Sequence, residues 1–374
     1  MQVALITDDI WLDEELGQFK HLIVGLLDES VHVVQVVPDG TDEDYLTAFG
    51  QKLQFGKIGR LRLHRWFLRR LASKLDEMKV TVLHALESRC WRGTLDLAAK
   101  LDLPVVLSLS SGRDLNRAAK LHKANANLRI GWLPATEPLA RGLRDRIGTE
   151  AFVQTVRIGV HLPEVPNFQS PPKPSSPQPD QTPDEHIPCV IVTGNGTFDS
   201  AYEQLFLGLT HVIAKHHYLQ VFLDIQGHDQ HRFWHAARKR GLLANLSFVP
   251  HRKGHRDLML HADMLIAPQA LGDARSLTLQ AMAQGIPIIA QIDPWLDYLV
   301  DGQTARLLDK PDATQWCKIL CELLADRQQL EHLSQRGREW IDEHHVPAQQ
   351  VQEVISVYRT LSGEAIPFTM DADG

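Results

Sequence analysis

The chain has 374 residues, more than one hydrophobic core usually organises, so two domains are expected. Hydrophobic residues make up 44% and charged residues 23% of the sequence, a composition typical of a soluble globular protein. The formal net charge of −7 argues against a nucleic-acid-binding protein, because neutralising phosphates requires a basic surface that dominates the chain.

Short apolar runs alternate with helical patterns through the first half of the chain. The apolar runs predict strands at 3–7, 31–37, 80–84 and 105–109, and helical patterns cover 19–27 and 95–100. Apolar runs of this length between helices indicate a parallel sheet that is buried on both faces. We therefore predict a doubly wound, Rossmann-like α/β domain over residues 1–164.

The segment 60–78 of this domain is both amphipathic and basic. Its apolar stripe consists of Leu63, Phe67, Leu71, Leu75 and Met78, and its cations are Arg60, Arg62, Arg65, Arg69, Arg70 and Lys74. The favoured interpretation is a helix that packs its stripe on the sheet, because a doubly wound domain needs a helix between 37 and 80. The alternative is a peripheral contact with an anionic membrane surface.

Residues 165–188 separate the two halves. This segment is rich in Pro, Ser, Gln and Asp and has little apolar content, so it cannot bury enough surface to order itself. We predict a linker or a disordered insertion between two domains.

The second half repeats the α/β alternation. Strands are predicted at 190–193, 219–225, 246–249, 264–267 and 286–290, and helices at 202–215, 228–240 and 276–284. Paired helices close the chain from 313 to about 361. We predict a second Rossmann-like domain over residues 189–374 that includes these terminal helices.

Residues 264–290 carry the most informative pattern. The strand at 264–267 leads through a polar turn into a helix, and Gly285 ends that helix before the strand at 286–290. The polar turn therefore follows the carboxyl end of a strand, where open α/β sheets bind ligands.

The same segment resembles the donor-sugar segment of the family-4 retaining glycosyltransferases of GT-B fold. The family signature A-M-A-x-G-x-P is matched by Ala281, Met282, Ala283, Gly285 and Pro287. Four further segments resemble family segments in the expected order, at 156–163, 222–251, 263–269 and 293–308. The resemblance implies two doubly wound domains facing a cleft, and transfer of a sugar from a nucleotide sugar to a glycan or lipid acceptor.

The residues with which that family performs donor chemistry are substituted here. The two glutamates of its E-x7-E motif fall on Gly272 and Gln280, and the Arg and Lys that neutralise the donor diphosphate fall on Asn195 and Ser200. Loss of one group that stabilises charge in the transition state typically costs about two to three orders of magnitude in rate. The resemblance therefore assigns no catalytic residue.

A donor site is still expected at the end of the second domain's strands. The helix from 276 presents backbone N–H groups, and Arg275 offers a guanidinium to a phosphate unless it is only a solvated turn residue. Asp273 is expected to cap this helix by accepting from the Ser276 amide. The resemblance implies donor-binding residues at Gly194, Asn195, Arg252, Arg275, Ser276, Leu277 and Gln280.

Two of these positions have specific expectations. Gln280 stands where the family grips the ribose hydroxyls, and an amide can still donate and accept hydrogen bonds there. Arg252 and Lys253 follow a predicted strand and could supply the missing cations, although a solvated turn is the favoured interpretation.

Two patterns raise the question of a metal site. Cys317 and Cys321 stand four residues apart, and His228, His231 and His235 share one face of a predicted helix. Small buried thiols and surface histidines are the favoured interpretations, because no carboxylate or cysteine completes the histidine set. We predict no metal and no cofactor, with the nucleotide sugar as a substrate.

The sequence also indicates a compartment. No run approaches the roughly 18 to 20 apolar residues needed to span a bilayer, and the N-terminus lacks a signal-peptide pattern. The four cysteines are too few and too scattered for a disulfide framework. We predict a cytoplasmic protein, peripheral on the inner membrane face if segment 60–78 binds lipid.

Two functions remain open. A glycosyltransferase of hexosyltransferase type with an atypical donor site predicts saturable nucleotide binding. A catalytically inactive GT-B pseudoenzyme that binds or scaffolds a protein partner predicts an intact fold without nucleotide affinity. A membrane-surface adaptor is compatible with either.

Overall fold

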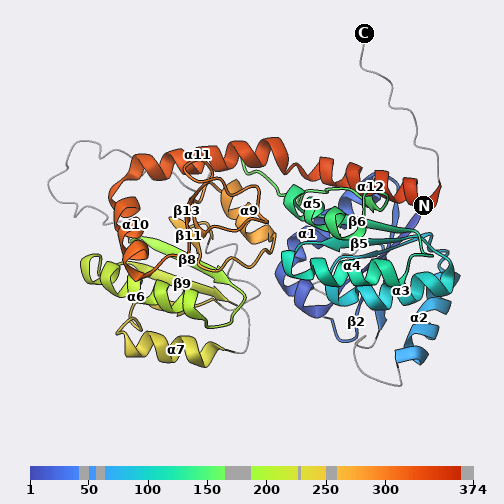
Figure 1. Ribbon diagram of the computed structural model, residues 1–374, viewed down its shortest axis with the longest axis horizontal. Helices are drawn as coiled ribbons and strands as arrows, with labels where there is room; N and C mark the ends of the chain where they lie inside the picture. The colour runs from blue at the N-terminus through green and yellow to red at the C-terminus, as the bar shows by residue number, and fades with distance from the viewer. Residues whose placement is uncertain (42–49, 56–63, 165–186, 226–228, 250–258, 364–374) are drawn as a thin grey trace, which may run out of the picture. The chain divides into compact units, whose positions relative to one another are not determined.

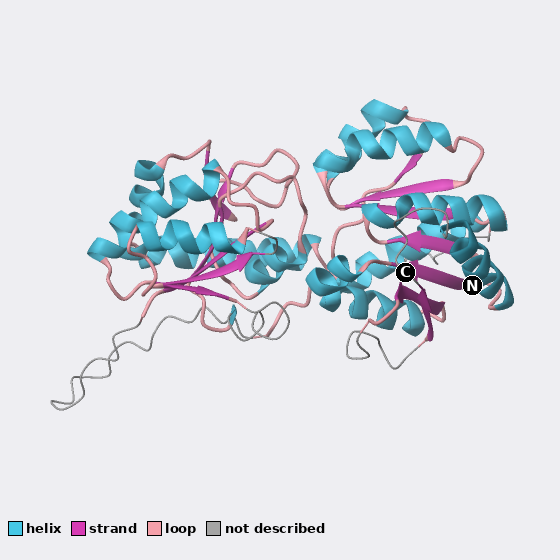
Figure 2. Ribbon diagram, turned by 90° about the horizontal axis from the view of Figure 1, so that it is seen from below, coloured by secondary structure: helices cyan, strands magenta, loops and turns pink. Residues whose placement is uncertain are grey.

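The computed structural model describes residues 1–41, 50–55, 64–164, 187–225, 229–249 and 259–363, which form two compact units (Figure 1). The first unit contains Met1–Gly159, Gly272–Ser276 and the described residues from His345 onwards, and the second contains Val160–Leu271 and Leu277–His344. Each unit is built on one sheet with parallel strand pairs (Figure 2). The two predicted Rossmann-like domains are thereby confirmed as a fold class.

The first sheet has seven strands in the order β3-β2-β1-β4-β5-β6-β7. They are β1 (Gln2–Ile6), β2 (His32–Pro38), β3 (Gln51–Phe55), β4 (Val82–Ala85), β5 (Val105–Leu109), β6 (Ile130–Pro134) and β7 (Phe152–Val153). The predicted strands are confirmed as β1, β2, β4 and β5. Strands β3, β6 and β7 were not predicted.

Helices cover both faces of this sheet. They are α1 (Asp9–Asp28), α2 (His64–Glu77), α3 (Trp91–Leu101), α4 (Leu115–Ala124), α5 (Glu137–Ile147) and α12 (Pro347–Ser362). Right-handed crossovers place α1 on one face and α3, α4 and α5 on the other. Helix α12 packs on α1, and α2 packs on α3.

Helix α2 confirms the favoured interpretation of the basic segment for the residues that are described. Leu71 and Leu75 of the predicted stripe are buried, together with Leu68, so this face packs into the unit. Leu63 and the first cations, Arg60 and Arg62, lie outside the described residues. The apolar stripe is therefore a core face, and any lipid contact must use other side chains of the helix.

Helix α12 was predicted within the second domain, but it belongs to the first unit. Its apolar face, which includes Val351, Val354 and Ile355, joins the core formed by α1 and the first sheet. The physical reason is that a helix with one apolar stripe is stabilised by whichever core it can reach. The predicted linker falls mainly on residues 165–186, which lie outside the described residues.

A buried polar contact also ties α12 to the first sheet. His84 of β4 has its Nδ1 2.5 Å from the Tyr358 hydroxyl of α12 and its Nε2 2.8 Å from Ser108 Oγ of β5. Burial lowers the pKa of His84 to about 3, so the imidazole is neutral at physiological pH. Both ring nitrogens thus have partners inside the core.

The second sheet has six strands in the order β10-β9-β8-β11-β12-β13. They are β8 (Cys189–Gly194), β9 (Gln220–Ile225), β10 (Leu246–Phe248), β11 (Met264–Ala267), β12 (Ile288–Gln291) and β13 (Ala305–Leu308). The helices are α6 (Ser200–Lys215), α7 (Gln230–Lys239), α9 (Ser276–Ala283), α10 (Ala313–Ala325) and α11 (Arg327–His344). All five predicted strands and the predicted helices are confirmed, whereas β13 was not predicted.

Replacing Tyr358 with Phe tests the polar contact between α12 and β4. The change removes only the hydroxyl, so His84 Nδ1 is left buried without its partner, and we expect unfolding to require about 1–3 kcal/mol less. Urea denaturation followed by circular dichroism measures the loss. The exposed Tyr218→Phe is the control, and equal stability of the two variants would contradict the prediction.

Candidate functional site

The carboxyl edge of the second sheet has its switch point between β8 and β11, where the strand order reverses. Two predicted site residues lie there, since Gly194 ends β8 and Asn195 follows it. The Asn195 amide donates to Gln269 Oε1, which comes from the segment after β11, at 3.2 Å. The structure thus joins the two strand ends at this point through Gln269.

Gln269 was not predicted as a site residue. Its side chain is buried, and its Nε2 donates to Asp199 Oδ2 at 2.7 Å and to the Thr197 carbonyl at 3.3 Å. The available signal was a polar residue directly after a buried apolar strand, the position at which α/β proteins place ligand contacts.

Gly194 has a steric role at the switch point. A Cβ at this position would overlap the Tyr202 hydroxyl and would lie 2.7 Å from Gln269 Oε1. The close approach of backbone, tyrosine and glutamine therefore requires glycine here.

The turn between β8 and α6 is held by carboxylate and amide side chains. Asp199 caps α6 by accepting from the amides of Ala201 and Tyr202 at 3.1 and 3.3 Å. Asn195 Oδ1 accepts from the Thr197 amide at 2.9 Å. These backbone donors therefore already have acceptors within the protein.

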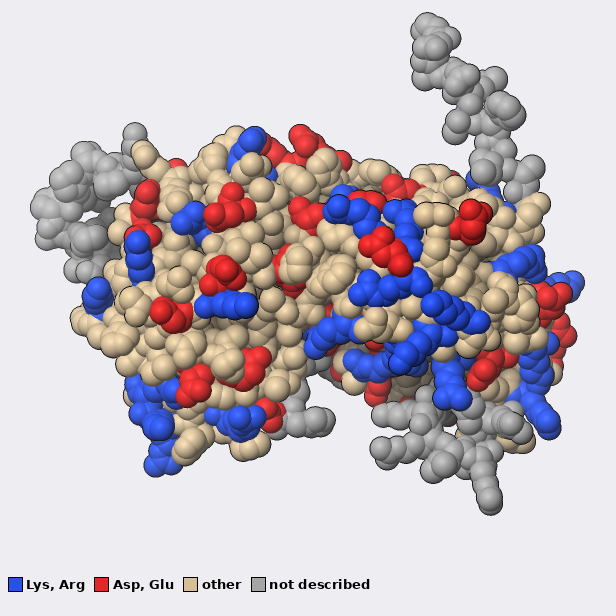
Figure 3. Space-filling model, in the orientation of Figure 1, with Lys and Arg blue, Asp and Glu red and all other residues tan. Residues whose placement is uncertain are grey.

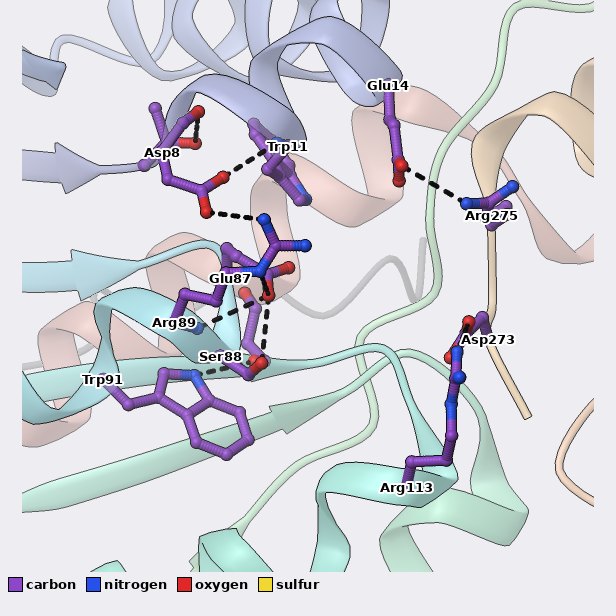
Figure 4. A network of polar contacts seen from close by, with 12 residues as sticks. Asp8, Trp11, Glu14, Glu87, Ser88, Arg89, Trp91, Arg113, Asp273 and Arg275 are labelled. Carbon is purple, nitrogen blue, oxygen red and sulfur yellow. Dashed lines mark hydrogen bonds and ion pairs between the residues drawn. The ribbon is translucent and has the colours of Figure 1, made fainter. Parts of the chain in front are cut away.

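The second group of predicted residues, Arg275 and Ser276, lies at the start of α9. Figure 4 shows Arg275 facing Glu14 of α1. The Ser276 amide donates to Glu15 Oε1 at 3.2 Å, and Arg275 pairs with Glu14 at 3.3 Å. The start of α9, predicted to face a phosphate, is thus held by two carboxylates of α1.

The prediction that Asp273 caps α9 is wrong. Residues 272–274 run beside residues 110–112, with an antiparallel bridge between Ser111 and Asp273. The Ala274 amide donates to the Ser110 carbonyl at 2.8 Å. Asp273 is consequently turned towards Arg113, with which it forms an ion pair (Figure 4). Glu15 accepts from the Ser276 amide instead.

Glu15 has an unusual environment for a carboxyl group. It is fully buried at a kink in α1, where its backbone is non-helical with φ −122° and ψ 27°. Burial raises its pKa from 4.5 to about 7, and the opposing effects of the Ser276 hydrogen bonds and the Arg275 charge are smaller. Its Oε2 has no hydrogen-bond partner among the described residues.

The donor role of the remaining predicted residues stays a prediction. Leu277 and Gln280 lie in α9 and are half-buried. Gln280 follows Ser276 by one helical turn, as predicted. Arg252, together with Lys253, lies outside the described residues.

The first sheet has a polar cluster at its own switch point, between β1 and β4 (Figure 4). Asp8 follows β1 and Glu87 follows β4, and Arg89 lies between them, 3.1 Å from Asp8 Oδ2 and 3.8 Å from Glu87 Oε1. Burial raises the pKa of Glu87, and the nearby Asp8 adds to this effect. Acidic residues directly after apolar strands were the available sequence signal for this cluster.

The cysteines and histidines considered for metal binding do not form a cluster in the described residues. No group of three or more His, Cys, Asp or Glu able to hold a metal ion is found in the described part of the chain. Cys317 and Cys321 are half-buried against the core of the second unit. His231 and His235 are exposed on α7, and His228 lies outside the described residues.

The overall architecture is shared with solved glycosyltransferases. The chain is 9% identical to a glycosyltransferase from Rickettsia africae, with 97% of this chain and 99% of that chain covered and a TM-score of 0.69. It is 11% identical to Anabaena HepE in complex with UDP and glucose, with 96% of this chain and 100% of that chain covered and a TM-score of 0.72. It is 14% identical to sucrose-phosphate synthase from Thermosynechococcus elongatus, with 98% of this chain and 100% of that chain covered and a TM-score of 0.71.

At these identities the similarity establishes the fold, which is the GT-B fold of glycosyltransferases. Residues 190–340, which include the switch point of the second sheet and α9, match the family of glycosyl transferases group 1. This part of the chain is therefore similar to the group 1 glycosyltransferases. No curated protein sequence matches the chain.

Replacing Glu15 with Gln tests its buried, neutral state. With a folded pKa of about 7 and an ordinary value of 4.5, the stabilising contribution of Glu15 is complete below pH 4.5 and is lost as the pH rises through 7. Gln does not titrate, so the variant should gain roughly 3 kcal/mol relative to the original protein between pH 4.5 and pH 8.

Urea denaturation at several pH values measures this difference. Glu29→Gln, at the exposed C-terminal end of α1, controls for the loss of one negative charge. A constant difference between Glu15→Gln and the original protein across this range would contradict the assignment.

Proposed function

We propose that the protein transfers a sugar from a nucleotide-sugar donor to a glycan or lipid acceptor, with an atypical donor site. The observation that carries this proposal is the match of residues 190–340 to group 1 glycosyltransferases. Similar structures include HepE with UDP and glucose, and Staphylococcus aureus TarM with α-GlcNAc-glycerol and UDP. These complexes support UDP as the first nucleotide to test.

The proposed donor site consists of the residues that the resemblance to the family implies. We assign to it Gly194, Asn195, Arg252, Arg275, Ser276, Leu277 and Gln280. Arg275 and the α9 backbone would stabilise the leaving diphosphate, and Gln280 would hydrogen-bond hydroxyl groups of the nucleoside. The nucleotide sugar is a substrate, and no cofactor is required by this scheme.

The second candidate function is a pseudoenzyme that binds or scaffolds a protein partner. Two observations favour it. Asn195 and Ser200 are uncharged, and the resemblance to the family implies that they stand where its members have cations. In addition, Asp199 and the α1 glutamates already accept from the backbone donors that would face an anion. A ligand phosphate would meet negative charge at both places.

Calorimetric titration with UDP, GDP, ADP and their sugar conjugates separates the two functions. A transferase should bind at least one nucleotide with micromolar affinity, and Arg275→Ala should weaken that binding at least tenfold because it removes the guanidinium. Arg336→Ala, which removes an exposed ion pair on α11, is the matched control. Folded protein that binds no member of the panel would favour the pseudoenzyme.

We also propose a peripheral contact of α2 with anionic lipid. Trp66 is 54% exposed, Arg70 stacks over its ring at 5.8 Å, and Arg69 is exposed beside it. Exposed tryptophan with arginine is typical of side chains that enter a membrane interface. No helix in the described part of the chain is long and apolar enough to cross a membrane.

The surrounding surface has the charge that such a contact needs. Figure 3 shows Lys and Arg side chains gathered over α4 and its neighbouring helices. The exposed cations of this surface are Arg113, Arg117, Lys120, Lys123, Arg141 and Arg146. They lie on the helical face of the first sheet that also carries α2.

Co-sedimentation with phosphatidylglycerol vesicles tests the lipid contact. The original protein should bind these vesicles in low salt and be released in high salt, because exposed charges are screened. Trp66→Ala should reduce binding severalfold, whereas Trp234→Ala, which removes an exposed tryptophan of α7, should not. Equal recovery on phosphatidylcholine vesicles would contradict an electrostatic contact.

A further inference from the structure

Two polar side chains lie together at the carboxyl edge of the second sheet. Thr193 of β8 and Asp224 of β9 are paired in the parallel register, each one residue before its strand ends. Both are buried, with 5% and 7% of their surface exposed. Because paired residues of neighbouring parallel strands point to the same face, the sheet places a hydroxyl beside a carboxylate at this edge.

The pair points away from the apolar core that α6 and α7 cover. Val192 and Leu223, the residues before Thr193 and Asp224, belong to that core, and successive side chains of a strand alternate between the two faces. The crossovers from β8 to β9 and from β11 to β12 run in opposite directions along the sheet, so right-handed connections put α6 and α9 on opposite faces. Thr193 and Asp224 therefore share the face that carries α9.

The Thr193 hydroxyl is not satisfied within the described part of the chain. Its Oγ1 is buried and has no hydrogen-bond partner there. A buried hydroxyl of this kind has lost its hydrogen bonds to water without replacement, which is unfavourable. Valine would fill nearly the same space without that cost. The hydroxyl therefore suits a hydrogen-bond partner that is added to the protein.

The Asp224 carboxylate indicates what that added group is. Aspartate is depleted in strands and seldom buried, and a carboxylate accepts hydrogen bonds from two donors at once but donates none. In dinucleotide-binding sheets, an acid further along the chain from the glycine turn of the first strand hydrogen-bonds the ribose 2′-hydroxyl. Asp224 lies on β9, the second strand of this sheet, next to the end of β8 at Gly194. Its position and its chemistry thus both match a ribose.

We propose that Asp224 and Thr193 bind the ribose of the nucleotide. Asp224 accepts hydrogen bonds from the 2′- and 3′-hydroxyl groups, and Thr193 Oγ1 completes the contact with the 2′-hydroxyl. This inference rests on the proposed function, because it adds two residues to the proposed donor site. Asp224 supplies a charged acceptor in addition to the neutral Gln280 of α9, and the contact selects ribonucleotides over deoxyribonucleotides whatever their base.

The test is calorimetric titration with UDP and with 2′-deoxy-UDP. The original protein should bind UDP about tenfold more tightly than 2′-deoxy-UDP, because the deoxynucleotide leaves buried acceptors unpaired. Asp224→Asn keeps the size of the side chain but removes its charge and one acceptor. It should weaken UDP binding about tenfold and reduce the preference for UDP to about twofold or less.

Asp263→Asn is the matched control. Asp263 lies at the opposite, amino edge of the same sheet, where its Oδ2 accepts from the Cys189 amide at 2.8 Å. Asparagine keeps an oxygen for that hydrogen bond and removes one negative charge. Both Kd values should therefore equal those of the original protein.

Thr193→Val separates a role in binding from a role in folding. It should weaken UDP binding severalfold, yet the urea midpoint should stay equal or rise, because the change removes a buried hydroxyl that has no partner in the described residues. Lower stability with an unchanged Kd would show that the hydroxyl serves the fold, and would overturn its assignment. Should Asp224→Asn fail to fold, the preference for UDP in Thr193→Val decides: a reduced preference supports the ribose contact, and an unchanged one overturns it.

The outcomes distinguish this inference from the proposed function. A preference for UDP that disappears in folded Asp224→Asn supports the ribose contact. UDP binding without any preference, or a preference that survives Asp224→Asn, overturns the ribose contact and leaves the transferase proposal standing. Folded original protein that binds none of UDP, GDP and ADP overturns both.

Discussion

Backbone N–H groups in the first turn of a helix have no partner within the helix, and in this protein carboxylates meet much of that need. Asp8 accepts from the Trp11 amide at 2.8 Å at the start of α1, and Asp199 accepts from two amides at the start of α6. At α9 the acceptor is Glu15, from the other end of the chain. All three helix starts follow a strand's carboxyl end, so the groups that stabilise the fold occupy the places where α/β proteins bind anions.

Glu15 differs from the two aspartates because its capping bond does not compensate for its burial. The aspartates lie near solvent and cap neighbouring residues, whereas Glu15 reaches a distant amide through a kink that departs from helical geometry. Its pKa of about 7 means that near neutral pH it is partly protonated, and a protonated carboxyl is a weaker acceptor than a carboxylate. The hydrogen bond that Glu15 accepts from the Ser276 amide is thus the weakest of the three capping interactions.

The sequence predicted most of the sheet framework, because buried parallel strands produce apolar runs that are visible without any tertiary information. It missed β3, in which only Leu53 is buried, and β13, in which only Ala305 is buried, since edge strands lose that pattern. Some of the polar residues near the strand ends could also be predicted from the sequence. Gly194, Arg275 and Ser276 were found because they follow strands or open a helix.

Contacts between distant segments could not be predicted. The cap of α9 was assigned to Asp273 on a rule that considers only neighbouring residues, but Arg113 competes for Asp273 and Glu15 competes for Ser276. The placement of α12 failed for the same reason, because its apolar face suits either core and only the packing against α1 decides. The burial of Leu71 and Leu75 of α2, by contrast, was the favoured prediction, because the apolar stripe is visible in the sequence.

The choice between a transferase and a scaffold depends on whether the proposed donor site can stabilise a diphosphate. A diphosphate leaving group carries more negative charge than the acids it would displace, so its attraction to Arg275 and to the α9 dipole exceeds theirs. Against this stand the repulsion from Glu14 and the absence of charge at Asn195. Whether a diphosphate binds at the proposed donor site therefore depends on the difference between this attraction and this repulsion, two electrostatic contributions of similar size.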